Sequence, residues 1–305
     1  MFMNVFIIVP VYNEAKVIDA LSNLKKFPEY KVVIVDDASS DRPAFENLNM
    51  PFTLIRHSIN LGQGAALQTG MQYALSKNAA IIVHFDADGQ HDFNDINKII
   101  DPIKYGLSDV VIGSRFLKNK KVISTLKIPL MKIIVLQIAR FVQFVFTGII
   151  LSDSQNGFRA FSNKAGLLIK ITENRMAHAI EIIQLIKRKN LRVKEVSIVI
   201  SYSDYSIQKG QKAINGIFII FCLIRKAIYE HKILLTTTLF IASFFTITGM
   251  LYNIGFVCIT LFAFFLSLLW FLVFSLAKIN RCKKITKTNK IRSEAIKNLK
   301  SFKNY

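Results

Sequence analysis

Four short apolar runs near the start of the chain each end in a cluster of polar residues, and this alternation constrains the fold more than any other feature. The runs cover residues 4–9, 32–35, 52–55 and 79–85, and stretches of helical character such as 15–26 and 65–77 separate them. Strands that alternate with helices are joined by right-handed crossovers and form a mainly parallel sheet. The pattern therefore predicts an α/β fold, and a later stretch at 193–200 is expected to add one more strand.

The polar clusters occupy the same place in each unit of this pattern. They begin at Pro10, Asp36, Asn60 and Asp86, soon after the preceding apolar run ends. Open sheets of this kind bind ligands at the carboxyl ends of their strands. We therefore expect one ligand site that draws on all four clusters.

The segment Phe-Asp-Ala-Asp-Gly-Gln-His at residues 85–91 is the most informative of these clusters. Asp86 and Asp88 stand one residue apart at the end of a buried strand, where two carboxylates are costly without a positive partner. Mg²⁺ favours one or two carboxylates together with phosphate oxygens. The segment thus indicates a divalent cation that bridges to a substrate diphosphate. The alternative is a polar Asp-Gly turn that caps the strand.

Five segments, in the right order, resemble the family 2 glycosyltransferases of the GT-A fold. They are Ile-Val-Pro-Val-Tyr-Asn-Glu (8–14), Val-Asp-Asp-Ala-Ser-Ser-Asp (35–41), Asn-Leu-Gly-Gln-Gly-Ala-Ala (60–66), Asp-Ala-Asp-Gly-Gln-His (86–91) and Ile-Gly-Ser-Arg-Phe (112–116). A sixth segment, Asp-Ser-Gln-Asn-Gly-Phe-Arg-Ala-Phe (153–161), is similar to the polyprenyl-phosphate branch of that family. This branch includes dolichyl-phosphate mannose synthases and bacterial undecaprenyl-phosphate sugar transferases. The resemblance covers about residues 4–225 and implies a Rossmann-like GT-A catalytic domain at 1–225.

The resemblance and the side-chain chemistry together imply a site for a nucleotide-sugar donor, either a UDP-sugar or a GDP-sugar. Carboxylates accept hydrogen bonds from nucleobase N–H groups and ribose hydroxyls. The implied donor set is Pro10, Tyr12, Glu14, Asp37 and Asp86, and the implied metal set is Asp86, Asp88 and Gln90. A bound Mg²⁺ or Mn²⁺ would neutralise the leaving nucleoside diphosphate. Tyr12 could instead be a core aromatic residue, and Asp37 a cap over the turn at 39–41.

The implied acceptor is a polyprenyl phosphate, a phosphate monoester whose second pKa is roughly 6. Because it is largely ionised near neutral pH, it needs cations to hold it more than a base to activate it. We expect Arg115 and Arg159 to clamp this phosphate, with a surface salt bridge as the alternative for each. Asp153 is then either a base or an orienting group.

Two residue sets complete the predicted acceptor side. The catalytic set is Asp88, Asp153, Arg115 and Arg159, and the acceptor-phosphate set is Arg115, Arg159 and Lys209. Lys209 lies in a polar, aromatic segment that the resemblance places near the active site as a loop. A plain surface loop is the alternative for that segment.

Residues 233–277 contain no Asp, Glu, Lys or Arg, and these 45 residues are enough for two membrane spans of about 20 residues each. We predict a transmembrane hairpin at 226–280, with spans at about 233–252 and 256–277. Basic residues flank the hairpin on both sides, and its loop is uncharged. The positive-inside rule then places both ends and the catalytic domain on the cytoplasmic side of the inner (plasma) membrane.

The chain carries 40 basic and 20 acidic residues, and much of the excess positive charge lies beside apolar segments. The basic tail at 281–305 suits an anionic inner leaflet. Residues 118–150 combine basic and apolar stretches, which predicts juxtamembrane amphipathic helices that guide the lipid acceptor. A third transmembrane span is the alternative there, and Arg140 disfavours it. We expect no nucleic-acid partner, because the sequence holds no nucleic-acid motif.

We therefore expect transfer of one sugar to an undecaprenyl-type phosphate, for cell-surface glycan synthesis or modification. A membrane enzyme that extends a saccharide chain is a rival. Such processive synthases carry a Gln-x-x-Arg-Trp motif, whereas the only tryptophan, Trp270, lies in a predicted span. A catalytically silent membrane scaffold is a second rival, which the intact Asp86, Asp88 and Arg159 disfavour. The resemblance also allows a homo-oligomer.

Overall fold

The computed structural model describes residues 3–14, 17–41, 43–117 and 148–200, together with positions 137, 140, 144 and 291. The chain divides into two compact units, Met1–Ile220 with Lys290–Tyr305, and Phe221–Asn289, and every described residue belongs to the first. Lys209, the predicted hairpin at 226–280, and most of 118–150 and of the basic tail lie outside the described residues. Among the described residues, no helix is both long enough and apolar enough to cross a membrane.

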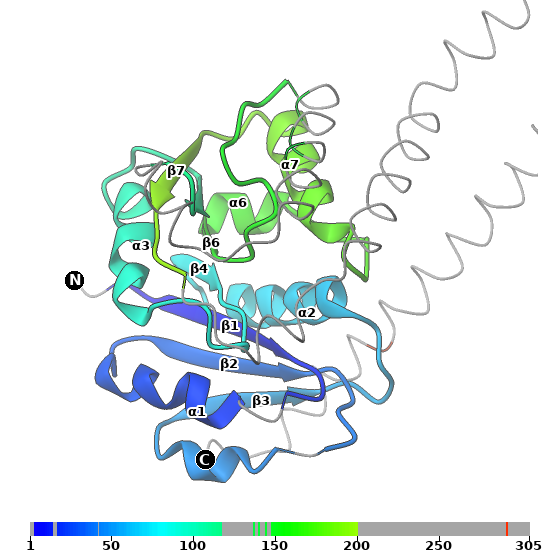
Figure 1. Ribbon diagram of the computed structural model, residues 1–305. Helices are drawn as coiled ribbons and strands as arrows, with labels where there is room; N and C mark the ends of the chain where they lie inside the picture. Colours follow the sequence, from blue (N-terminus) through cyan, green and yellow to red (C-terminus); the bar gives the residue numbers. More distant parts are fainter. Residues whose placement is uncertain are drawn as a thin grey trace, which may run out of the picture. The chain divides into compact units, whose positions relative to one another are not determined.

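The first unit is built on one sheet, to which the described residues contribute seven strands (Figure 1). The strands are β1 Val5–Val11, β2 Lys31–Asp36, β3 Phe52–Arg56, β4 Ile81–His84, β5 Val110–Ser114, β6 Arg159–Ser162 and β7 Val193–Ser197. Their order in the sheet is β3-β2-β1-β4-β6-β5-β7. All neighbours pair in parallel except β6, which runs antiparallel to both β4 and β5. The predicted α/β fold with a mainly parallel sheet is confirmed.

The register brings the carboxyl ends of the central strands to one edge of the sheet. Val11 on β1 stands opposite Asp36 on β2, and Ile8 on β1 stands opposite His84 at the end of β4. The polar segments that follow these three strands therefore emerge at the same edge. This is the edge at which the sequence predicts a ligand site.

The described residues form α-helices and short 3-10 helices, some of which lie in the stretches that the sequence predicts. They are α1 Val17–Leu21, α2 Gln63–Ser76, α3 Ile96–Lys104, α6 Asn163–Leu168 and α7 His178–Arg188, with 3-10 helices η1 Ser22–Lys26, η2 Phe45–Leu48 and η3 Phe93–Asp95. The stretch predicted as one helix at 15–26 divides into α1 and the tighter η1. The stretch predicted at 65–77 begins two residues earlier, at Gln63.

Both faces of the sheet are covered, because successive residues of a strand point to opposite faces. On one face, Ile7 and Val9 join a buried cluster with apolar side chains of α1 and α3. On the other face, Phe6 and Ile8 join a second buried cluster with side chains of α2, α6 and α7. Strands buried on both faces are apolar throughout, which is why they read as continuous runs in the sequence.

Helix α2 lies very close to the sheet. A Cβ atom on its Gly70 would lie 2.2 Å from Ile8 Cγ2, so only glycine permits this approach. The close packing fixes the position of the amino end of α2, which borders the predicted ligand edge.

Candidate active site

A cavity of about 560 Å³ opens at the carboxyl ends of β1, β2 and β4. The predicted site residues among those lining it are Pro10, Tyr12, Glu14, Asp37, Asp86, Asp88, Gln90, Arg115 and Arg159. Residues predicted from separate motifs therefore share one cavity. Asp153 contacts Arg115, which forms part of the wall.

Asp86 sits at the centre of several contacts in this cavity. Gln63 Nε2 donates to Asp86 Oδ1 over 2.8 Å, and His91 Nε2 lies 3.7 Å from Oδ2. A Cβ on Gly157 would lie 2.1 Å from the same Oδ2, so the Asn-Gly turn brings bare backbone against this carboxylate. Burial alone would raise the pKa of Asp86, but the nearby His91 and Arg159 hold it below its ordinary value.

The pKa of the neighbouring carboxylate, Asp88, is shifted in the opposite direction. Burial, and then the negative charge of Asp86, raise the pKa of Asp88 to about 6. Its Oδ1 accepts a hydrogen bond of 3.0 Å from the backbone N–H of Gln90. The two negative charges repel each other, and a cation bound between these carboxylates and a ligand would relieve the repulsion.

These residues fit a hard divalent cation such as Mg²⁺ or Mn²⁺. Asp86 and Asp88 offer carboxylate oxygens, and Gln90, on the same cavity wall, offers an amide oxygen. No group of three or more His, Cys, Asp or Glu ligands gathers anywhere in the described part of the chain. A cation held here would therefore complete its coordination with oxygens of a substrate and of water, as Mg²⁺ commonly does at phosphate sites.

Asp37 is buried, with 2% of its surface exposed, and holds the loop in front of α2. Its Oδ1 accepts from the N–H of Leu61 over 2.9 Å, and its Oδ2 accepts from the N–H of Gly62 over 2.6 Å. His57 Nδ1 lies 2.7 Å from Oδ1, and His57 Nε2 lies 2.9 Å from the hydroxyl of Thr69. A ribose-binding role for Asp37 stays a prediction.

Two of the alternatives left open by the sequence do not fit the structure. The turn at 39–41 is held by Asp36, whose Oδ1 accepts from the N–H of Ser39 over 2.9 Å, so Asp37 is not its cap. Tyr12 is 50% exposed at the cavity and is not a core aromatic residue.

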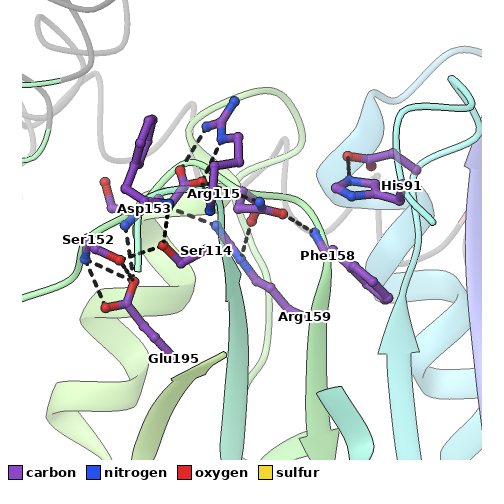
Figure 2. A network of polar contacts seen from close by, with 12 residues as sticks. His91, Ser114, Arg115, Ser152, Asp153, Phe158, Arg159 and Glu195 are labelled. Atoms are coloured by element: carbon purple, nitrogen blue, oxygen red, sulfur yellow. Dashed lines mark hydrogen bonds and ion pairs between the residues drawn. The ribbon is translucent and has the colours of Figure 1, made fainter. Parts of the chain in front are cut away.

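Arg115 and Asp153 form a bidentate ion pair beside the cavity (Figure 2). Arg115 Nε donates to Asp153 Oδ2 over 2.6 Å, and Arg115 Nη2 donates to Oδ1 over 2.8 Å. The Asp153 side chain is 1% exposed. Of the two roles left open for Asp153, base and orienting group, these contacts are those of an orienting group.

A second carboxylate supports this pair from the neighbouring strand (Figure 2). Glu195 on β7 accepts from the N–H groups of Ser152 and Asp153 over 2.9 and 3.0 Å, and from the Ser152 hydroxyl over 2.9 Å. No role for Glu195 follows from the sequence, because it lies inside a strand and far from every motif.

Arg159 is almost fully enclosed, with 1% of its surface exposed. Its Nε, Nη1 and Nη2 donate to the carbonyls of Asn156, Ala179 and Ser154 over 2.8, 3.3 and 3.1 Å. Burial lowers its pKa to about 10, which leaves it charged at neutral pH. The surface salt bridge considered for Arg159 is excluded. The structure instead shows an internal tie between the turn at 154–157 and α7, and a phosphate contact stays a prediction.

Three further cavity residues, Gln63, Arg175 and His178, received no binding role from the sequence. The sequence suggests either a solvated position or a supporting role behind the site for His178; the solvated position is excluded, because only 5% of this residue is exposed, and burial lowers its pKa to about 4. The only sequence signal for Gln63 and Arg175 was their proximity to the Gly-Gln-Gly segment and to the start of α7.

Comparison with known proteins gives consistent results. A family model described as "Glycosyl transferase family 2" matches residues 6–165. The chain is 36% identical over 228 residues to an uncharacterised protein of Methanocaldococcus jannaschii, covering 74% of this chain and 93% of that protein. It is 32% identical over 240 residues to a UDP-N-acetylglucosamine–dolichyl-phosphate N-acetylglucosaminyltransferase of Methanococcus voltae, covering 72% and 94%.

A solved structure agrees with the fold. It is a glucosyl-3-phosphoglycerate synthase of Mycobacterium tuberculosis in complex with Mn²⁺, UDP and phosphoglyceric acid. The TM-score is 0.50 at 16% identity, and the match covers 72% of this chain and 78% of that one. Together with the family match, this likeness confirms the GT-A fold expected from the sequence.

Proposed function

We propose that this chain, which belongs to glycosyl transferase family 2, transfers one sugar from a nucleotide-diphosphate sugar to a polyprenyl phosphate of the undecaprenyl or dolichyl type. The observation that carries the proposal is the shared cavity, in which the Asp86–Asp88 pair and Arg115 lie together. The similarity to a dolichyl-phosphate sugar transferase over most of both chains supports this choice of acceptor.

The carboxylate side of the cavity would bind the donor. Pro10, Tyr12, Glu14 and Asp37 line the part of the wall that follows β1 and β2, where the nucleoside would bind. Asp86, Asp88 and Gln90 would hold Mg²⁺ or Mn²⁺, which, when bound, neutralises the leaving diphosphate. Asp86 is oriented for this by Gln63 and by the bare backbone of Gly157.

The arginine side would hold the acceptor. A phosphate oxygen of the polyprenyl phosphate attacks the anomeric carbon and forms the new C–O bond. The bond from that carbon to the diphosphate breaks, and its electron pair leaves with the nucleoside diphosphate, so the configuration inverts. Because the attacking phosphate is already ionised, no base must remove a proton. Arg115, fixed by Asp153, would position this phosphate.

We further propose that the reaction takes place at the cytoplasmic face of the inner membrane. The uncharged stretch at 233–277 and its basic flanks support a hairpin anchor that keeps both termini in the cytoplasm. The basic tail and the segment at 118–150 would lie against anionic lipid, where the acceptor is embedded.

A transfer assay tests the proposed function. Purified full-length protein in detergent would be incubated with undecaprenyl phosphate or dolichyl phosphate and a panel of UDP- and GDP-sugars, with Mg²⁺, Mn²⁺ or a chelator. We expect a lipid-extractable sugar product that depends on the divalent cation. Absence of product with every donor, from folded protein that binds a nucleoside diphosphate, would instead assign the acceptor to another class.

A further inference from the structure

Three of the described residues that line the cavity are arginines, and their contacts differ. Arg115 is paired with Asp153, and Arg159 donates to three backbone carbonyls. Arg175 is exposed, and within the described ranges its guanidinium has neither a carboxylate partner nor a carbonyl partner. A guanidinium on a cavity wall without a protein partner is available to a ligand.

The segment that carries Arg175 is nevertheless held firmly in place. The carbonyl of Asn174 accepts from the N–H groups of Gly64 and Ala65 over 2.8 and 3.3 Å, at the start of α2. The Nδ1 atom of His178 lies 2.9 Å from the carbonyl of Arg175 itself. Both sides of the segment are therefore tied to helices that border the cavity.

A buried carboxylate adds a second anchor. Glu181 on α7 accepts from the N–H groups of Thr172 and Glu173 over 2.9 and 2.7 Å. Glu181 is only 6% exposed, so its carboxylate bonds to the backbone of this segment rather than to solvent. These contacts hold the backbone of residues 172–175 in place beside the cavity.

Two glycines of the Gly-Gln-Gly segment at 62–64 allow the backbone of residues 173–175 to pass close by. A Cβ on Gly62 would lie 2.4 Å from the carbonyl oxygen of Asn174 and 2.9 Å from Arg175 Cγ. A Cβ on Gly64 would lie 2.1 Å from the carbonyl oxygen of Glu173. Gly62 also has a φ of +102°, which other residues rarely adopt. The stem of Arg175 is thus packed against the loop that Asp37 holds.

We propose that Arg175 binds a phosphate group of a substrate. The cavity wall carries the carboxylates of Glu14, Asp37, Asp86 and Asp88, and Arg175 adds to it a positive charge that no carboxylate of the described residues pairs with. The planar guanidinium matches two phosphate oxygens at once. The group is either the diphosphate of the donor or the phosphate of the acceptor, and the inference rests on the proposed function.

The test compares Arg175→Gln, Arg175→Lys and Arg188→Gln in the full-length chain. Arg188 is exposed at the end of α7 and does not line the cavity, so it controls for the loss of one positive charge. Steady-state kinetics would be measured while each substrate is varied in turn. We expect Arg175→Gln to raise one KM by about ten- to a hundredfold, the range for a lost charged hydrogen bond. Arg175→Lys should restore part of the loss, and Arg188→Gln should match the wild type.

The substrate whose KM rises identifies the phosphate that Arg175 binds. Unchanged values for both substrates, in an Arg175→Gln protein that transfers sugar like the wild type, would overturn the inference and leave the proposed function intact. If the wild type transfers no sugar, the proposed function fails. Calorimetric binding of UDP, GDP and a short-chain polyprenyl phosphate then decides the inference by itself. Equal affinities for each ligand in wild type and Arg175→Gln would overturn it.

Discussion

The two sides of the cavity are assembled in different ways. On the side of β1, β2 and β4, each side chain of interest follows its own strand, as Tyr12, Asp37 and Asp86 do. On the side of β5, β6 and β7, Arg115 directly follows β5 and Arg159 begins β6, and their side chains are further held by polar contacts with other segments, such as Arg115 with Asp153. The strands bring both sets to the cavity, and the two arginine side chains are then oriented by protein acceptors, which are a carboxylate for Arg115 and backbone carbonyls for Arg159.

The two sides also differ in how far their charges are compensated. Asp86 and Asp88 oppose each other, and the pKa of Asp88 is raised to about 6 as a result of burial and this repulsion. Arg115 and Arg159 are already satisfied by protein groups. The carboxylate side therefore favours a bound cation, whereas Arg115 and Arg159 are hydrogen-bonded to protein groups before any ligand binds.

The largest expected effect comes from the carboxylate side. Asp88→Asn should reduce the transfer rate by about a thousandfold, similar to the loss of an electrostatic group that stabilises a transition state. Asp92→Asn is the matched control, because Asp92 only caps the short η3 helix and does not line the cavity. Transfer rates at saturating Mn²⁺ would measure both, and wild-type transfer by the Asp88→Asn protein would show that Asp88 has no part in catalysis.

On the side of β5, β6 and β7, the largest effect should be on the free energy of unfolding. Arg159→Met leaves three buried carbonyls without their donors, which should lower the free energy of unfolding by about 3 kcal/mol. Urea titration of the full chain in detergent would measure it, with the exposed Arg188→Met as control. Wild-type stability together with a loss of acceptor binding would show that Arg159 is a phosphate clamp after all.

A smaller effect should follow from loosening the support of Arg115. Glu195→Gln keeps the size of the side chain, but it removes the negative charge and replaces Oε2, which accepts from the N–H of Ser152, by a donor; the remaining amide oxygen can still accept from Ser152 and Asp153. We expect a loss of about tenfold in kcat/KM for the acceptor, as for other groups that orient a ligand-binding residue. The KM for the donor should stay constant, and a rise in that KM would break the proposed division of the cavity.

The smallest effect concerns an ion pair outside the cavity. The hydrogen bond from Arg192 lowers the pKa of Asp109 below its ordinary value. The stabilisation of the fold by this ion pair is therefore present above the pKa that Asp109 has in the unfolded chain, and it is lost as the pH falls through the pKa that Asp109 has in the folded protein. Asp109→Asn should lower the unfolding temperature slightly at pH 7 and not at all below the folded pKa. A loss as large as that for Arg159→Met would contradict the ranking.

The sequence predicted the carboxylate side well because each polar cluster directly follows an apolar run. It gave no sign of β6, whose four residues begin with Arg159 and pair only with segments far away in the chain. It identified the charge of Arg159 but not its burial, which depends on α7. The position of Arg175 was equally hidden, since it depends on two glycines more than a hundred residues earlier.

The most direct test of this division is a pair of binding titrations with Asp88→Asn and Glu195→Gln. Binding of UDP or GDP in the presence of Mn²⁺, and binding of a short-chain polyprenyl phosphate, would each be measured for both variants and the wild type. We expect Asp88→Asn to weaken the binding of the nucleoside diphosphate alone, and Glu195→Gln to weaken the binding of the polyprenyl phosphate alone. If both variants weaken the same ligand, the donor and acceptor sides are not separate as described.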